Sequence, residues 1–244
     1  MRRFYAPPDS FAEQRVQLSV DETRHLRDVL RLRAGDNISV FDGRGHEFTC
    51  IIETIGKQFS TLVIVDQISP HAPESSLDLT LAVTLLKGEK LDLVIQKAVE
   101  LGISKLQPLL SKRCDVRPTG GDKRTERWKK ISLEAAKQSG RAKLMEVEGL
   151  VSFESFVKNL GSTAYESPEL ILFTERDGSR FSEIKQSKKL TAVFGPEGGW
   201  EDSELILARE HGFCLITLGG RILRAETAAI SVAAVLQHRF GDFS

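Results

Sequence analysis

From residue 77 onward, two kinds of apolar run alternate along the chain, and this alternation limits the possible folds more than any other feature. Short runs typical of buried strands are interspersed with longer runs that have the spacing of amphipathic helices. The strand-like runs are 77–85, 105–110, 169–173, 191–194 and 213–218. The helical runs are 89–101, 123–139, 153–160, 201–211 and 225–240. This order predicts an α/β fold in which helices flank a mostly parallel sheet.

The chain before residue 69 has a different pattern, that of short strands joined by tight turns. The turns are marked by Asp42-Gly43-Arg44-Gly45 and Ile55-Gly56-Lys57. The strands are expected over 37–42, 46–55 and 59–68. A short amphipathic helix is expected over 21–32, which leads into these strands. The pattern predicts a compact β-rich unit.

A stretch rich in proline and serine separates the two patterns. The sequence Ser69-Pro-His-Ala-Pro-Glu-Ser-Ser76 interrupts both strand and helix periodicity. The predicted organisation is therefore a β-rich domain over residues 1–69, a linker over 70–76 and an α/β domain over 77–244.

Composition excludes several classes of protein. The chain is 41% hydrophobic and 28% charged, and no apolar run approaches the roughly 20 residues that a membrane helix needs. No apolar stretch of signal-peptide length follows Met1, so we expect a cytoplasmic protein. The three cysteines and five histidines lack the spacings of metal sites, so no metal is expected.

The charges are balanced overall but segregated along the chain. Lys105 to Lys143 carries twelve basic and four acidic residues, whereas Glu146 to Glu210 carries thirteen acidic and seven basic residues. A basic stretch of this kind is compatible with a solvated helix face and with a surface that binds RNA.

Two glycine-rich loops follow predicted strands. In an open parallel sheet, ligands bind beyond the carboxyl ends of the strands, so these loops are candidate binding loops. The first, Gly195-Pro-Glu-Gly-Gly199-Trp200, holds more glycine than a tight turn requires, which favours close approach of backbone to a ligand. Its spacing differs from that of dinucleotide-binding loops, so no nicotinamide cofactor is expected.

The second loop begins at Leu218-Gly-Gly and leads into a helix so rich in alanine that we expect it to be buried. Arg221, Arg224, Glu226 and Thr227 stand at its entrance. Helix capping with solvated arginines is one interpretation, and binding of an anion or a base is the other. Neither loop comes with a Ser/His/Asp order or paired carboxylates, so hydrolase chemistry is not expected.

Several segments together resemble the ribosomal RNA small subunit methyltransferase E (RsmE) family. They are Lys97-Ala-Val-Glu-Leu-Gly102, Glu134-Ala-Ala-Lys-Gln-Ser-Gly-Arg141, Gly195-Pro-Glu-Gly-Gly199 and Leu218-Gly-Gly-Arg-Ile-Leu-Arg-Ala-Glu-Thr-Ala228. Near the N-terminus, Arg3-Phe4-Tyr5, His25-Leu26 to Val29-Leu30-Arg31, and Val40-Phe-Asp-Gly43 resemble that family's PUA-like RNA-binding barrel. The order and spacing of these motifs along nearly the whole chain make the resemblance specific. The sequence departs from the family pattern at Met145, where proline is expected, and at Trp200, where phenylalanine is common.

The resemblance implies a fold and an activity. The fold is a SPOUT methyltransferase domain with a mostly parallel sheet and a C-terminal trefoil knot, preceded by a small PUA-like β-barrel. The activity is transfer of a methyl group from S-adenosylmethionine to N3 of a uridine in 16S ribosomal RNA, within the small ribosomal subunit. The family's architecture further implies a homodimer, and neither a membrane nor a metal is implied.

The resemblance also implies roles for particular residues. Arg224, with Arg221 as second candidate, would stabilise negative charge on the uracil oxygens, and Glu197 would help to remove the proton or orient its loop. The residues expected to hold the cofactor are Thr174, Gly195, Gly198, Gly199, Leu218, Gly219 and Leu223. The residues expected to contact RNA are Arg2, Arg3, Arg24, His25, Arg27, Arg31, Arg113, Gln138 and Arg141.

Two other functions stay open on the sequence alone. One is a knotted RNA methyltransferase with a different target, such as a ribose 2′-hydroxyl. The other is a non-catalytic ribosome-assembly factor that binds RNA through its barrel and basic stretch.

Overall fold

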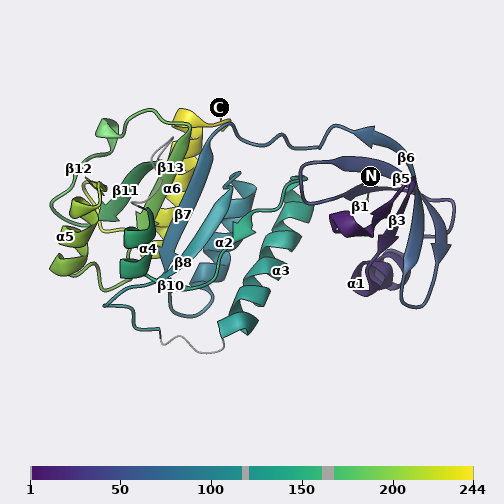
Figure 1. The fold of residues 1–244 in the computed structure, drawn as a ribbon, viewed down its shortest axis with the longest axis horizontal. Coiled ribbons are helices and arrows are strands. Elements are labelled where there is room, and N and C mark those ends of the chain that lie inside the picture. The colour runs from purple at the N-terminus through teal and green to yellow at the C-terminus, as the bar shows by residue number, and fades with distance from the viewer. Residues whose placement is uncertain (1, 117–120, 161–167, 244) are drawn as a thin grey trace. The chain divides into compact units, whose positions relative to one another are not determined.

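The computed structural model describes residues 2–116, 121–160 and 168–243 (Figure 1). It consists of two compact units. The first holds Met1–Glu74 and Ala136–Leu144, and the second holds Ser75–Ala135 and Met145–Ser244. The change of unit after Glu74 falls within the predicted linker, but Ala136–Leu144 had been assigned by sequence to the second domain. The extents of the two functional domains stay a prediction.

The first unit is built on one six-stranded sheet. Its order is β1 (Arg3–Tyr5), β4 (Asn37–Phe41), β5 (Glu47–Ile55), β6 (Ser60–Ile68), β3 (Arg15–Leu18) and β2 (Phe11–Ala12). β1 pairs with β4 in parallel, and the other neighbours are antiparallel. The three longest strands match the predicted ones closely, whereas β1, β2 and β3 are too short for periodicity to reveal.

The predicted helix over 21–32 forms only in part. Residues Val20–Arg24 form α1, with Ser19 as its N-cap, and His25–Val29 continue as a π-helical turn. The turn ends before Arg31, which has a positive φ of 52°. Leu26 is fully buried in the unit's core, while the 3-10 turn Pro8–Ser10 has no buried residue.

The segment Ala136–Leu144 belongs to the first unit because its backbone bonds to residues there. The Arg3 guanidinium donates to the carbonyl oxygens of Ala136, at 2.9 Å, and Arg141, at 2.7 Å. It also forms an ion pair with Glu47 at 2.9 Å, in which the Glu47 side chain is only 3% exposed. Burial alone would raise the pKa of Glu47, but hydrogen bonds from Arg3 and Ser39 outweigh it and hold that pKa below its ordinary value.

The second unit contains an eight-stranded sheet whose strand pairs are all parallel. The order is β10 (Val151–Ser152), β8 (Lys105–Leu110), β7 (Asp78–Thr84), β13 (Lys189–Phe194), β11 (Glu169–Thr174), β14 (Cys214–Thr217) and β12 (Ser179–Arg180), with β9 (Glu146–Val147) also paired to β8. The helices are α2 (Lys90–Glu100), α3 (Gly121–Ser139), α4 (Phe153–Leu160), the 3-10 turn Phe181–Glu183, α5 (Asp202–Glu210) and α6 (Ala225–Phe240). The prediction of a mostly parallel α/β sheet is confirmed.

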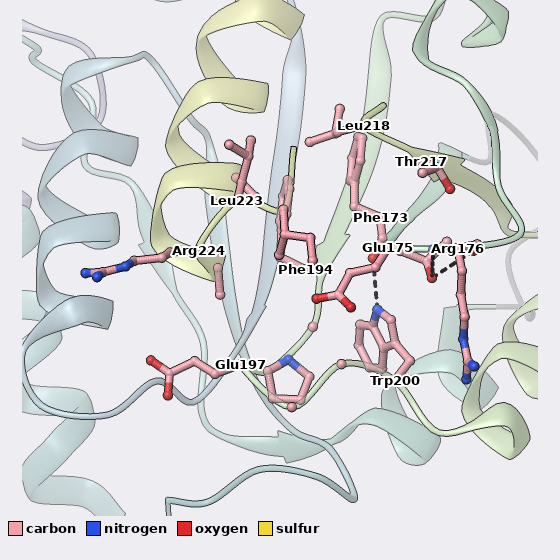
Figure 2. Close-up of a pocket in the computed structure, with 18 of the residues that line it drawn as sticks. Phe173, Glu175, Arg176, Phe194, Glu197, Trp200, Thr217, Leu218, Leu223 and Arg224 are labelled. Atoms are coloured by element: carbon pink, nitrogen blue, oxygen red, sulfur yellow. Dashed lines mark hydrogen bonds between the residues drawn. The ribbon is translucent and has the colours of Figure 1, made fainter. Parts of the chain in front are cut away.

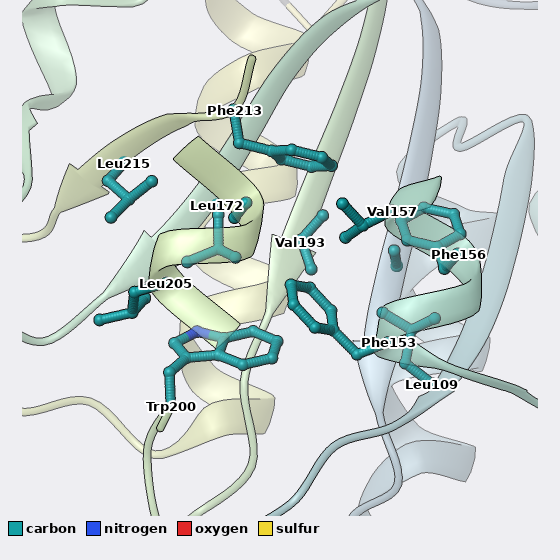
Figure 3. Close-up of a cluster of buried hydrophobic side chains, with 12 residues drawn as sticks. Leu109, Phe153, Phe156, Val157, Leu172, Val193, Trp200, Leu205, Phe213 and Leu215 are labelled. Carbon is teal, nitrogen blue, oxygen red and sulfur yellow. The ribbon is translucent and has the colours of Figure 1, made fainter. Parts of the chain in front are cut away.

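Helices pack on both faces of this sheet, because successive strand residues point to opposite sides. On one face, Leu172 and Val193 belong to a buried cluster (Figure 3). The cluster also contains Phe153 of α4, Trp200 of the loop before α5, and Leu205 of α5. α6 contacts β7 and β13 and packs against α2.

The alanine-rich helix α6 is buried on one side only. Ala229, Ala233 and Leu236 are fully buried, but Val235 is 46% exposed. The expected burial is therefore found on one face of the helix, because a helix packed on a sheet leaves its opposite face uncovered. No helix in the described part of the chain is long and apolar enough to cross a membrane.

Candidate functional site

A pocket of about 1080 Å³ opens in the second unit where β11, β13 and β14 end (Figure 2). These three strands are neighbours in the sheet, with β11 in the middle. Both glycine-rich loops, 195–200 after β13 and 218–224 after β14, line the pocket. Parallel strands bring their carboxyl ends to one edge, which is why loops far apart in sequence form one cavity.

In the first loop, Gly195 makes room for a protein side chain. A Cβ atom at this position would lie 2.8 Å from the Trp200 indole. The indole is buried, and its Nε1 donates a hydrogen bond to the Phe173 carbonyl oxygen at 2.9 Å. Gly199 differs, because its φ of +70° is a conformation that favours glycine. Gly198 lies against Arg113, 3.4 Å from the position of a Cβ.

The second loop presents its backbone to the cavity. A Cβ atom at Gly219 or Gly220 would meet nothing within 4 Å. Within the described ranges of the chain, no group accepts a hydrogen bond from the backbone N–H groups of Gly219 to Leu223. These backbone groups are therefore free to bind a ligand; the close backbone approach predicted for the first loop stays a prediction.

Charged side chains around the pocket are partly paired with one another. Lys90 of α2 contacts the Glu197 carboxylate and lies 3.8 Å from that of Glu226. Arg176 forms an ion pair with Asp202 at 2.6 Å. These pairs fix the positions of the first loop and of the turn after β11.

All residues predicted to hold a cofactor line this pocket, together with the predicted catalytic residues. Arg221 and Arg224 are exposed and, among residues 2–116, 121–160 and 168–243, neither has an acidic partner. The structure adds Lys90, Glu175 and Arg176, which the sequence analysis missed. The position of Glu175 directly after a predicted strand, next to Thr174, was the signal that could have revealed it.

The lining suits a nucleoside that carries a charged group. The Phe173 and Phe194 rings stack in parallel, with their centres 4.8 Å apart, and Leu218 and Leu223 add further apolar surface. Open backbone donors and unpaired arginines lie around this apolar part. This mixture of apolar surface and exposed polar groups is compatible with a site for a small organic ligand that is itself partly polar.

Comparison with known proteins shows which family this chain belongs to. Residues 73–237 match the RNA methyltransferase domain family, and residues 18–65 match the RNA methyltransferase PUA domain family. The ribosomal RNA small subunit methyltransferase E of Synechocystis is 34% identical, over 93% of this chain and 74% of the relative. That of Rickettsia conorii is 33% identical, over 95% of this chain and 93% of the relative. The chain belongs to the RsmE family.

Solved structures agree with this membership. The RsmE enzyme of Neisseria gonorrhoeae was solved bound to S-adenosylmethionine. Its match covers 100% of this chain and 100% of that chain, with a TM-score of 0.89 and 35% identity. A methyltransferase of Legionella pneumophila, solved with the same cofactor, has a TM-score of 0.87 and 33% identity over 99% of this chain and 98% of the other. The predicted family is confirmed, and the PUA match lies within the predicted β-rich domain.

The residues that the RsmE resemblance nominated for RNA contact fall into different environments. Arg2, Arg24, Arg31 and Gln138 are exposed in the first unit, and Arg113 lines the pocket of the second. Two further residues are only partly exposed. Arg27 pairs with Asp28 and donates to two turn carbonyls, and the ring of His25 lies edge-on to Phe4.

Arg3 and Arg141 have structural partners instead. The guanidinium of Arg141 is 4% exposed and pairs with Glu74 at 2.6 Å. Arg3 is held by Glu47, lies 4.1 Å from the centre of the Phe41 ring and donates to two carbonyl oxygens. These contacts hold the first unit together, so the structure does not offer either side chain to RNA.

No metal centre accompanies the site. Among the residues that the structure describes, no group of three or more His, Cys, Asp and Glu side chains could hold a metal ion. The three cysteines are free thiols.

Proposed function

We propose that this protein transfers a methyl group from S-adenosylmethionine to N3 of a uridine in 16S ribosomal RNA. The observation that carries the proposal is the likeness, over the whole chain, to an RsmE enzyme solved with S-adenosylmethionine. The single pocket that gathers the nominated cofactor residues supports it. When bound, the cofactor supplies a methyl group on a sulfonium, which is a strong electrophile.

The second glycine loop holds the cofactor through its backbone. The N–H groups from Gly219 to Leu223 are available as donors to ring nitrogens and hydroxyls. The first loop and Thr174 close the opposite side of the cavity. Leu218 and Leu223 would offer apolar surface to the adenine.

The arginines of the pocket act on the uridine. N3 of uracil is a weakly acidic imide nitrogen, which becomes a good nucleophile only after its proton leaves. The resulting negative charge spreads onto the uracil oxygens, where a fixed cation stabilises it. Arg224, the N-cap of α6, is the first candidate and Arg221 the second, because both line the pocket without an acidic partner in the described chain. Glu197 orients its loop, since its carboxylate is already engaged by Lys90.

RNA binding uses the first unit as well as the rim of the pocket. Arg2, Arg24 and Arg31 are exposed there and suited to phosphate contacts, and Arg113 is an exposed cation in the pocket lining of the second unit. The substrate is the 16S RNA within the small ribosomal subunit. The protein works in the cytoplasm, and its C-terminal segment forms the trefoil knot of its family.

The working form is a homodimer. Ile222 is 85% exposed, Val235 46% and Leu223 37%, so apolar side chains beside the pocket and on α6 lie uncovered in one chain. A second copy would cover them and border the site. Sedimentation velocity at micromolar concentration should give the mass of a dimer, and a monomer mass would remove this part of the proposal.

The activity is tested with small ribosomal subunits from a strain that lacks the modification. Labelled methyl groups should transfer from S-adenosylmethionine to the 16S RNA, and nucleoside digestion should yield 3-methyluridine. A 2′-O-methylated nucleoside would instead support a different target. Failure to bind S-adenosylmethionine at all would support a non-catalytic RNA-binding factor.

A further inference from the structure

Among the carboxylates that line the pocket, Glu175 is the one without a partner in the described part of the chain. It follows Thr174, the last residue of β11, and so stands between the two glycine loops. Figure 2 shows its side chain projecting inward from the strand end, between the labelled positions of Phe194 and Trp200 in that view. The pocket lining includes Glu175, and its neighbour Arg176 is turned to Asp202.

The charges of the lining show why this carboxylate is distinctive. Glu197 is engaged by Lys90 and Asp202 by Arg176. Glu175 has neither an ion pair nor a hydrogen bond with any residue in the described part of the chain. Its side chain is exposed, and its Oε2 atom lies near Gly199 of the first glycine loop, 3.8 Å from the position of a Cβ.

We propose that Glu175 accepts hydrogen bonds from the 2′- and 3′-hydroxyls of the cofactor ribose and makes the pocket selective for a ribonucleoside. This rests on the proposed function, because it assigns one group of S-adenosylmethionine to one residue. Two carboxylate oxygens match two neighbouring hydroxyl donors, as acidic residues do in other α/β nucleotide sites.

The chemistry disfavours the sulfonium, one of the two other cofactor groups that a carboxylate could hold. Methyl transfer to an anion removes the positive charge of the sulfonium, so a carboxylate against it would stabilise the reactant more than the transition state. The carboxylate at the amino acid end suits Arg221 and Arg224, which have no acidic partner in the described part of the chain. The ammonium group of that end is the remaining alternative to the ribose, and the dideoxy analogue separates the two.

The test measures ligand affinity by calorimetry in the wild-type protein and in the Glu175→Gln variant. Glutamine keeps the shape of the glutamate side chain but has no charge. Three ligands are used: S-adenosylmethionine, S-adenosylhomocysteine and the 2′,3′-dideoxy analogue of S-adenosylhomocysteine. The variant should bind the first two about tenfold to a hundredfold more weakly, the range expected for hydrogen bonds to a charged group. Removing both hydroxyls should weaken binding to the wild type by a similar factor and to the variant by little.

Asp177→Asn is the matched control, since it removes the same charge two residues away and outside the pocket lining. Its affinities should equal those of the wild type. Equal affinity of Glu175→Gln for all ligands would overturn the proposal. So would a loss confined to S-adenosylmethionine, which points to the sulfonium. In a further outcome, Glu175→Gln binds S-adenosylmethionine and S-adenosylhomocysteine more weakly, while the loss of both hydroxyls still weakens its binding as much as it does in the wild type. That result would point to the amino group as the partner of Glu175 and would overturn the proposal as well. If the wild type binds neither S-adenosylmethionine nor S-adenosylhomocysteine, the proposed function itself fails.

Discussion

Replacing Gly195 with alanine should destabilise the protein through Trp200. A Cβ at position 195 would lie 2.8 Å from the indole Cε2 and Nε1 atoms, whereas ordinary contact begins at 3.4 Å. The indole or the strand end must therefore move by about 0.6 Å, the difference between 3.4 and 2.8 Å. The indole has little freedom to do so, because it is 5% exposed and its ring centre lies 4.7 Å from that of Phe153.

The size of the effect follows from two contributions. Overpacking a well-packed core typically costs about 1–3 kcal/mol. Displacement also weakens the hydrogen bond from Trp200 Nε1 to the Phe173 carbonyl, now 2.9 Å long. A buried carbonyl left without its donor adds about 1–3 kcal/mol. We therefore expect the free energy of unfolding of Gly195→Ala to fall by about 2–6 kcal/mol.

Urea denaturation followed by far-UV circular dichroism measures this change in four proteins: wild type, Gly195→Ala, Trp200→Phe and the double variant. Phenylalanine is smaller than tryptophan and lacks the Nε1 atom, so it leaves room for the alanine methyl. The two changes should therefore be non-additive by about 1–3 kcal/mol, with the double variant more stable than the sum predicts. Additive costs within about 0.5 kcal/mol would refute the packing role of Gly195.

Gly219→Ala is the contrasting variant. Its Cβ would meet nothing within 4 Å and its φ is not in the left-handed region, so stability should be almost unchanged. The methyl group would instead enter the pocket and weaken binding of S-adenosylhomocysteine. If both glycine variants affected stability and binding alike, the structure would have assigned their roles wrongly.

Three further outcomes are expected. Arg224→Ala should lower turnover in the methyl-transfer assay by about a hundredfold or more while RNA affinity, measured by filter binding, changes little; near-normal turnover would shift the role to Arg221. Burial raises the pKa of the Cys50 thiol to about 12, so iodoacetamide at neutral pH should spare it in the folded protein and modify it in urea; rapid modification of the native protein, mapped by mass spectrometry, would contradict this. In the folded protein, the pKa of Glu47 is held below its ordinary value of about 4.3 despite burial. The ionised Glu47 therefore stabilises the fold fully above that pH, and this stabilisation is lost as the pH falls through the folded pKa. Glu47→Gln should flatten the decline of the free energy of unfolding at acid pH, and an unchanged decline would count against the Arg3 ion pair.

RNA binding by the first unit is best tested by substitution of exposed arginines and not by deletion of the unit. Deleting residues 1–69 would remove Arg3 and the strands that hold Ala136–Leu144, so the deletion would disturb α3 as well. Charge removal at Arg24 and Arg31, which are exposed, is the cleaner perturbation. RNA affinity should fall and its salt dependence should become shallower, whereas cofactor affinity should not change.

The sequence by itself determined the parts that depend on local pattern. The alternation of strand-like and helical runs predicted the parallel sheet, since burial on both faces leaves an apolar signature in each short strand. The rule that ligands bind at the carboxyl ends of strands then located the pocket at the loops after β13 and β14, and the family motifs identified what it binds.

Only the tertiary structure decided which side chains are free to act. Arg3 and the Arg141 carbonyl are 138 positions apart in the chain, and Lys90 and Glu197 are 107 apart. No local period encodes such contacts, because they arise where separate elements pack. For this reason the sequence nominated Arg3 and Arg141 for RNA and Gly195 for the ligand, whereas packing engages Arg3 and Arg141 with partners in the first unit and sets Gly195 against the Trp200 indole. The same packing leaves Glu175 as the carboxylate of the pocket without a partner among the described residues.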